Sequence, residues 1–109
     1  MELTFLGKET QGGGSPTLFE TDRNSYVVQG WRVTGHPSTT VEIPASLLGH
    51  LPPDAALGAE LIATGRRWQG DSGECETLLI SGDSLDDVVL AKLDVPDHEA
   101  CIEVQRKER

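Results

Sequence analysis

The triple glycine Gly12–Gly14 is the first segment whose composition could do chemistry, because glycine-rich loops cradle phosphate groups with their backbone amides. A Walker-type loop needs a lysine followed by Ser or Thr at the start of a helix. Here Ser15-Pro16-Thr17 follows instead, and the segment after it is rich in β-forming residues. We therefore predict that the glycines are a flexible lead into a β-hairpin, and we predict no nucleotide cofactor.

Cysteines and histidines are the other residue types here that bind metals or act in nucleophilic catalysis. They do not form the close Cys or His pairs of structural zinc sites, and no motif places a histidine base beside a cysteine or serine. We therefore predict no catalytic residue, no metal and no cofactor, and we interpret Cys101 as a small buried residue on a strand. The candidate metal ligands in the sequence are Cys75, Cys101, His36, His50 and His98.

The aromatic residues point to an interaction surface. In the run 25–33, Val27, Gln29 and Trp31 point to one face, whereas Tyr26 and Val28 point to the other. Apolar groups on both faces indicate a central strand covered on both sides, or a strand at a subunit contact. Aromatic and arginine side chains are the usual anchors of protein interfaces. Our candidate contact residues are Tyr26, Trp31, Arg32 and Trp68.

The elements that would position these residues are mostly short strands. The runs 17–21 and 25–33 flank Asp22-Arg23-Asn24 and predict a β-hairpin, and Gly30 indicates a bulge or the close approach of another backbone. A second hairpin is predicted around the turn 70–73. Further strands are expected at 3–6, 39–43, 59–64 and 100–104. Two of these share an apolar–Glu–apolar pattern, Val41-Glu42-Ile43 and Ile102-Glu103-Val104, which suggests a duplicated β unit.

Two segments have helical character. Pro44 suits the first position of a short helix that continues over 45–51. Leu85, Val88, Val89 and Leu93 follow helical spacing behind a hydroxyl cap at Ser84, which predicts a helix over 85–93. The β-branched pair Val88-Val89 leaves a strand as the alternative for that segment.

Length and charge exclude several classes of protein. A chain of 109 residues is expected to form one domain, 1–109, with a disordered tail over 105–109. Its net charge of −9 repels phosphate backbones, so we predict no direct binding to nucleic acid. The sequence has no apolar run approaching the roughly 18 to 20 residues of a membrane helix and no signal peptide, so we predict a cytoplasmic protein.

Several blocks of the sequence, "LTFLGK", "GGSPTLFETDRNSYVVQGWRV", "TVEIPASLL" and "DVPDHEACIEV", resemble a family of small actinobacterial proteins without an assigned activity. Members of that family tend to be encoded near helix-turn-helix regulators, so the resemblance implies an accessory regulatory role. The chain is short between Val33 and Val41, where relatives often carry a longer helical insert. The resemblance implies no catalytic residue.

Together these observations predict a mainly β (α+β) fold: a small, strongly bent antiparallel sheet or partly open barrel with one or two short helices. The leading functional hypothesis is a non-catalytic protein-interaction module and a homodimer, whose acidic surface suits a basic DNA-binding regulator. The alternative is a small-ligand-binding domain with a pocket near Trp31 or Trp68. An enzyme of unknown type is the third possibility.

Overall fold

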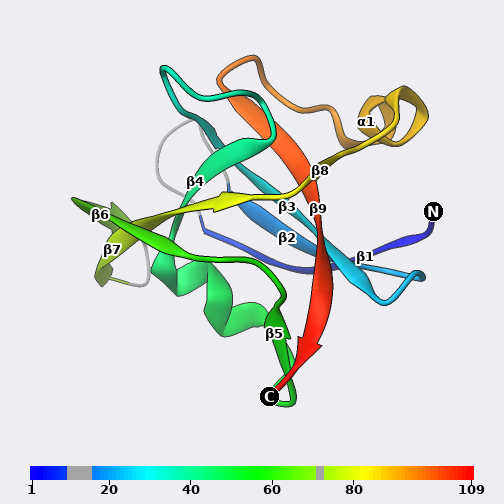
Figure 1. Ribbon diagram of the computed structural model, residues 1–109, viewed down its shortest axis with the longest axis horizontal. Coiled ribbons are helices and arrows are strands. Elements are labelled where there is room, and N and C mark those ends of the chain that lie inside the picture. The colour runs from blue at the N-terminus through cyan, green and yellow to red at the C-terminus, as the bar shows by residue number, and fades with distance from the viewer. Residues whose placement is uncertain (10–15, 71–72) are drawn as a thin grey trace.

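The computed structural model describes residues 1–9, 16–70 and 73–109. The described residues form nine strands, one short 3-10 helix (η1) and one short α-helix (Figure 1). Every strand pair is antiparallel, so the predicted mainly β class is confirmed. In chain order the elements are β1 (Leu3–Lys8), β2 (Thr17–Thr21), β3 (Ser25–Arg32), β4 (Thr40–Pro44), η1 (Ala45–His50), β5 (Ala55–Leu57), β6 (Ile62–Gly70), β7 (Gly73–Ser81), β8 (Asp83–Ser84), α1 (Asp87–Leu93) and β9 (Glu99–Glu108).

The first predicted hairpin is confirmed as β2 and β3, which pair with Leu18 opposite Val28. Asn24 closes its turn in the left-handed conformation, with φ of 58°. The Thr21 hydroxyl accepts the backbone N–H of Arg23 at 3.0 Å, which is a hydrogen bond typical of such turns. The prediction for Gly12–Gly14 concerns residues outside the described part of the chain. The second hairpin is β6 and β7, which pair up to Gly70 opposite Gly73.

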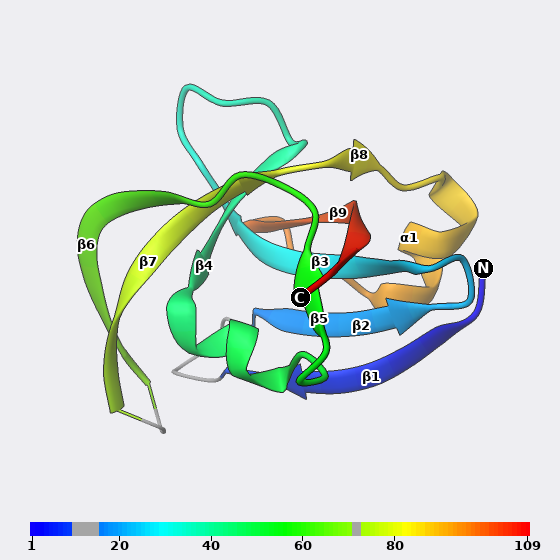
Figure 2. The ribbon, with the colours of Figure 1, turned by 60° about the horizontal axis from the view of Figure 1, so that its bottom comes forward.

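The sheet is organised around β3, in the order β1-β2-β3-β4-β7-β6, with β9 branching from β3. β3 pairs with β2, with β9 along most of its length, and with β4 at its end. β9 also pairs with β5 and β8. Figure 2 shows β4, β7 and β6 turned away from the layer of β1, β2 and β3. Over the described residues this path is a strongly bent sheet that is not closed into a barrel.

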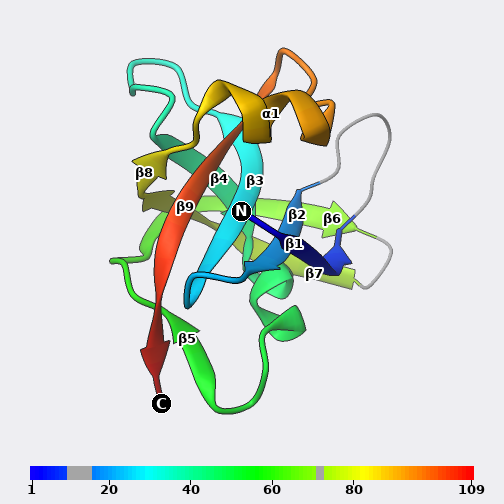
Figure 3. The ribbon, with the colours of Figure 1, turned by 90° about the vertical axis from the view of Figure 1, so that its right-hand side faces the viewer.

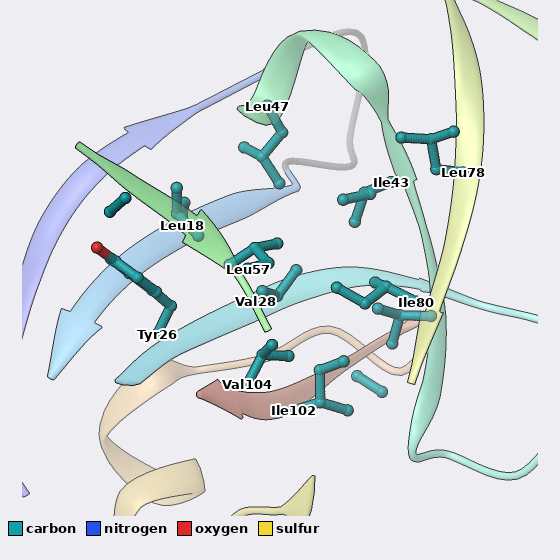
Figure 4. Packing of buried hydrophobic residues seen from close by; sticks show 13 residues of the cluster. Leu18, Tyr26, Val28, Ile43, Leu47, Leu57, Leu78, Ile80, Ile102 and Val104 are labelled. Carbon is teal, nitrogen blue, oxygen red and sulfur yellow. The ribbon is translucent and has the colours of Figure 1, made fainter. Parts of the chain in front are cut away.

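The main core fills the concave side of this bend (Figure 4). Val28 lies on this face because side chains alternate along a strand, and residues of β4, β7 and β9 face it. Leu47 of η1 closes one side and is fully buried. The largest members of this cluster are Leu18, Tyr26, Val28, Val41, Ile43, Leu47, Leu57, Leu78, Ile80, Ile102 and Val104.

A smaller core lies on the opposite face of β3 and β9. Val27 and Cys101 point to this side and pack against Leu85 and Val89 beneath α1. Figure 3 shows α1 beside the ends of β3 and β9. β3 is therefore a central strand covered on both faces within one chain, as one of the two interpretations of its pattern predicted. Its second apolar face gives no independent support for a homodimer.

Four details differ from the sequence predictions. The strand expected over 59–64 begins only at Ile62 and continues to Gly70 as the first strand of the second hairpin, β6. The helix begins at Asp87, because the Asp86 side chain accepts the backbone N–H of Val89 at 3.0 Å and so acts as the N-cap. Ser84, the predicted cap, lies in β8 instead. The predicted tail is also different: Gln105 to Glu108 continue β9, and the segment 106–108 pairs with β5.

Gly30 marks the predicted close approach of another backbone. A Cβ atom built at Gly30 would lie 2.7 Å from the carbonyl oxygen of Glu42 on β4. Glycine is therefore required where β3 and β4 meet.

The described helices are too short and too polar to cross a membrane.

Candidate functional site

The two tryptophans of the chain meet on the face of the sheet opposite the main core. Trp31 extends from β3 and Trp68 from β6, and their ring centroids are 5.9 Å apart with the ring planes tilted by 50°. β3 and β6 are separated in the sheet by β4 and β7, so the contact of the two rings joins strands that are not neighbours. Both side chains are partly exposed. They line an open hollow of about 380 Å³ together with residues of β4, β6 and β7 and with His98.

Trp31 stands between two buried carboxylates. It is directly opposite Glu42 on β4 and directly opposite Glu99 on β9. Residues that are opposite each other in an antiparallel pair share a face of the sheet, so all three side chains belong to the side of the hollow. Glu42 is 8% exposed and Glu99 is fully buried. The row Glu99–Trp31–Glu42 places an aromatic ring between two carboxylate groups.

Glu42 is held by hydrogen bonds from two directions. The Thr77 hydroxyl donates to its Oε2 at 2.5 Å. Arg66 donates from Nε to the same oxygen at 3.1 Å and from Nη2 to Oε1, which makes a bidentate pair. The Thr64 hydroxyl contacts the Thr77 hydroxyl at 2.5 Å and extends the network. These bonds compensate the loss of hydration of the Glu42 carboxylate.

The rim of the hollow carries further charges. Arg67 donates from Nε to Glu74 at 2.8 Å, and this hydrogen bond raises the pKa of Arg67 above its ordinary value. His98 Nε2 lies 3.8 Å from Glu99 Oε2, so a protonated His98 would pair with that carboxylate. The Glu99 carboxylate also accepts a hydrogen bond of 2.5 Å from Gln29 Nε2. The guanidinium groups of Arg66 and Arg67, which line the hollow, are therefore each already engaged by a carboxylate.

No known protein family, curated protein or solved structure matches this chain. A functional assignment therefore depends on the geometry of the hollow and on the charges around it.

Two of the four predicted contact residues form the site. Trp31 and Trp68 are brought together, whereas Arg32 is not among the lining residues of this hollow and donates from Nε to the carbonyl oxygen of Asp97 at 2.9 Å. Tyr26 is fully buried in the main core on the other face. Burial raises the pKa of its hydroxyl, which has no hydrogen-bond partner among the described residues. As placed, Tyr26 does not reach the surface on which Trp31 lies.

Sequence reasoning missed five residues of the hollow: Glu42, Arg66, Arg67, Thr77 and His98. Glu42 carried a readable signal, since a glutamate between Val41 and Ile43 must point away from the face that those two residues occupy. The same signal occurs at Glu103, between Ile102 and Val104.

Glu103 is held in the same way as Glu42. It is 7% exposed and accepts a hydrogen bond of 2.5 Å from the Ser25 hydroxyl and another of 2.5 Å from Arg23 Nη2. Each of the two apolar–Glu–apolar strands thus buries its glutamate behind an arginine and a hydroxyl group. The arrangement at Glu42 differs in having two tryptophans beside it.

The described residues contain no group of three or more His, Cys, Asp or Glu side chains placed to hold a metal ion. Cys101 is 6% exposed, as its interpretation as a buried strand residue predicted. Burial, followed by the charge of Glu99, raises the pKa of its thiol to about 12. A thiol with so high a pKa is a poor nucleophile at neutral pH.

Proposed function

We propose that this protein is a non-catalytic interaction module that binds a basic partner protein through the hollow between Trp31 and Trp68. The observation that carries the proposal is the pairing of these two rings, partly exposed, on an open face of the sheet. Tryptophan is enriched among the residues that dominate binding energy, because it offers a large and rigid apolar area. Two such rings in contact form a ready anchor for a partner's side chain.

The net charge of the chain favours a basic partner. Arg66 and Arg67 are already engaged by carboxylates, so they offer little free positive charge. The whole chain carries −9, which attracts a positively charged protein and repels an acidic one. The lining itself holds Glu42 beside Arg66 and Arg67, so the preference for a basic partner rests on the net charge of the chain.

The hydrogen bonds at the base of the hollow support binding over catalysis. The Thr77 hydroxyl donates a hydrogen bond to the Glu42 carboxylate, which also accepts hydrogen bonds from Arg66. A general base would instead need an oxygen free to take a proton from a substrate. The family resemblance described above favours a DNA-binding regulator as the basic partner. We propose that the two proteins bind in the cytoplasm.

Tryptophan fluorescence provides a direct test, because the chain has two tryptophans and both line the hollow. We expect a short peptide rich in Arg and Lys to change this fluorescence at concentrations where an acidic peptide of the same length has no effect. The change should weaken with added salt, since exposed charges are screened. Equal responses to the two peptides would contradict the preference for a basic partner.

The physiological partner is sought by affinity purification from the native cell. Wild-type protein is compared with Trp68→Ala and with Phe5→Ala, which removes an exposed aromatic residue from β1, outside the hollow. We expect a basic protein to be retained by the wild type and by Phe5→Ala and lost with Trp68→Ala. A partner retained equally by all three proteins would show that binding does not use the hollow. Light scattering on the purified protein tests the homodimer, which remains a prediction.

A small ligand is the second candidate for the same hollow. Its volume of about 380 Å³ lies within the range of small-molecule sites, roughly 300 to 1,000 Å³. A small molecule that raises the melting temperature of the wild type and not of Trp68→Ala would favour this candidate.

A further inference from the structure

A second hollow, of about 390 Å³, lies between α1, the segment 94–98 and β9. It is separate from the tryptophan hollow, because the two hollows are lined by different residues. Its wall is formed by the side of α1, and its floor is formed by β9 beside the smaller core. The apolar part of the lining consists of Leu85, Leu90, Ala91, Val95, Pro96, Ala100 and Cys101. A hollow of this size with a mostly apolar lining and a few polar groups has the composition of a small-molecule site.

Half of the six polar residues that line this hollow are acidic. Three carboxylates, those of Asp87, Asp97 and Glu99, line it together with one guanidinium group, that of Arg32. Arg32 donates from Nε to the backbone carbonyl of Asp97, which holds the guanidinium group at the rim. Asp87 and Asp97 are exposed at the opening. The net charge of the lining is therefore negative and adds to the negative charge of the whole chain.

Glu99 extends this negative charge into the wall of the hollow. Its side chain is fully buried, held by Gln29 and next to His98. Its effect is seen at the neighbouring thiol, where the charge of Glu99 adds to burial in raising the pKa of Cys101. A buried carboxylate acts over a longer range than an exposed one, because less water screens it. A positive group that enters the hollow therefore meets a favourable potential.

We propose that this hollow binds an organic cation with an apolar body, such as an alkylammonium compound. The apolar body lies against Leu85, Leu90 and Val95, and the ammonium group remains at the opening near Asp87 and Asp97. The site does not depend on the partner-binding function proposed for the tryptophan hollow, because the two hollows have no lining residue in common, although Glu99 of this hollow is also opposite Trp31.

Three probes of equal chain length test the proposal: hexylammonium, hexanol and hexanoate. Binding is measured by titrating each probe into isotopically labelled protein and following the backbone amides by NMR. We expect hexylammonium to shift amides of the segment 84–101 and to bind about tenfold more tightly than hexanoate, with hexanol between them. Equal affinities for the three probes, or no binding of hexylammonium, would overturn the proposal.

Two substitutions on α1 locate the site. Ala91 is exposed and lines the hollow, so Ala91→Phe places a ring within it. Val88→Phe is the matched control, because Val88 is 68% exposed on the same helix and outside the lining. We expect Ala91→Phe to abolish hexylammonium binding and Val88→Phe to leave it unchanged. If Ala91→Phe fails to fold, Ser38→Phe blocks the hollow from the loop before β4.

The charge preference is tested at Asp97. Asp97→Asn keeps the backbone carbonyl that Arg32 contacts and removes one negative charge from the opening. We expect the preference for hexylammonium over hexanol to fall about threefold, with little change in the affinity for hexanol. Binding of hexylammonium that persists in Ala91→Phe, or a preference that is unchanged in Asp97→Asn, would overturn the assignment.

Discussion

The pair formed by Arg66 and Glu42 should contribute measurably to stability, although Arg66 is largely exposed. The side chain of Arg66 is 63% exposed and that of Glu42 is 11% exposed. Two unit charges about 4 Å apart interact by about 4 kcal/mol at an effective dielectric constant of about 20. Water around Arg66 screens this attraction, and Thr77 still donates to Glu42 when Arg66 is replaced. We therefore expect Arg66→Met to lower the free energy of unfolding by about 1 to 3 kcal/mol.

The neighbouring arginine provides the control. Arg67→Met makes the same change in size and charge one residue along β6, but it breaks a pair with Glu74 in which both side chains are more than half exposed. We expect no measurable loss of stability from Arg67→Met. In the double variant Arg66→Met with Glu42→Gln, most of the loss should be recovered, because no buried charge is left without its partner.

Urea denaturation followed by far-ultraviolet circular dichroism measures these differences, since each variant has the same backbone to unfold. The comparison of the two single variants tests whether Arg66 stabilises the buried Glu42 carboxylate. If Arg66→Met and Arg67→Met are equally stable, Glu42 does not depend on Arg66. The same conclusion would follow if the double variant were less stable than Arg66→Met alone.

Four further outcomes are expected from the structure. In the native protein at neutral pH, Ellman's reagent should modify Cys75 and spare Cys101, because the pKa of about 12 lowers the thiolate fraction of Cys101 about a thousandfold. Both thiols should react in urea. Folding raises the pKa of Cys101 from 9.0, so its neutral thiol contributes its full stabilisation of the folded state below pH 9.0. This contribution should be lost as the pH rises from 9.0 to about 12, which the midpoint of urea denaturation measures. Tyr26→Phe should leave the free energy of unfolding unchanged or raise it by up to about 1 kcal/mol, because the buried hydroxyl has no partner among the described residues; a clear loss of stability would reveal one. Gly30→Ala should cost about 1 to 3 kcal/mol of unfolding free energy, since its Cβ would press on the backbone of β4, whereas Gly49→Ala, which meets nothing within 4 Å, should be tolerated.

Local patterns predicted most of the elements, but not β5 or β8. The alternation of Val27 and Val28 identified a strand with two covered faces, and the turn 22–24 identified the hairpin. Helical spacing found α1 but misplaced its start by two residues, because both Ser84 and Asp86 are good caps. The prediction of a tail at the charged end of the chain was wrong because the order of that segment depends on pairing with β5, a contact that the local sequence does not reveal.

The candidate site was less predictable because it depends on tertiary structure. Trp31 and Trp68 were each identified as candidate contacts, yet their contact depends on the tertiary arrangement of two strands that are separated by β4 and β7 in the sheet. Glu42 could have been found, since its position between two core residues points it to the opposite face. Arg66 could not, because its pairing depends on how β6 lies against β7 and β4 in the folded chain.

The position of β9 has a consequence for how the molecule folds. β9 supplies the second neighbour of β3, with Ser25 opposite Gln105, and ion pairs such as Arg23–Glu103 join residues 80 positions apart. Loop closure over such a distance is slow. The second edge of β3 therefore stays unpaired until most of the chain has been synthesised and β9 can pair with it. During that interval the nascent chain presents an apolar strand with one side unpaired. Ribosome-bound chains that end before residue 99 should therefore be the species most prone to aggregate and the ones on which chaperones act.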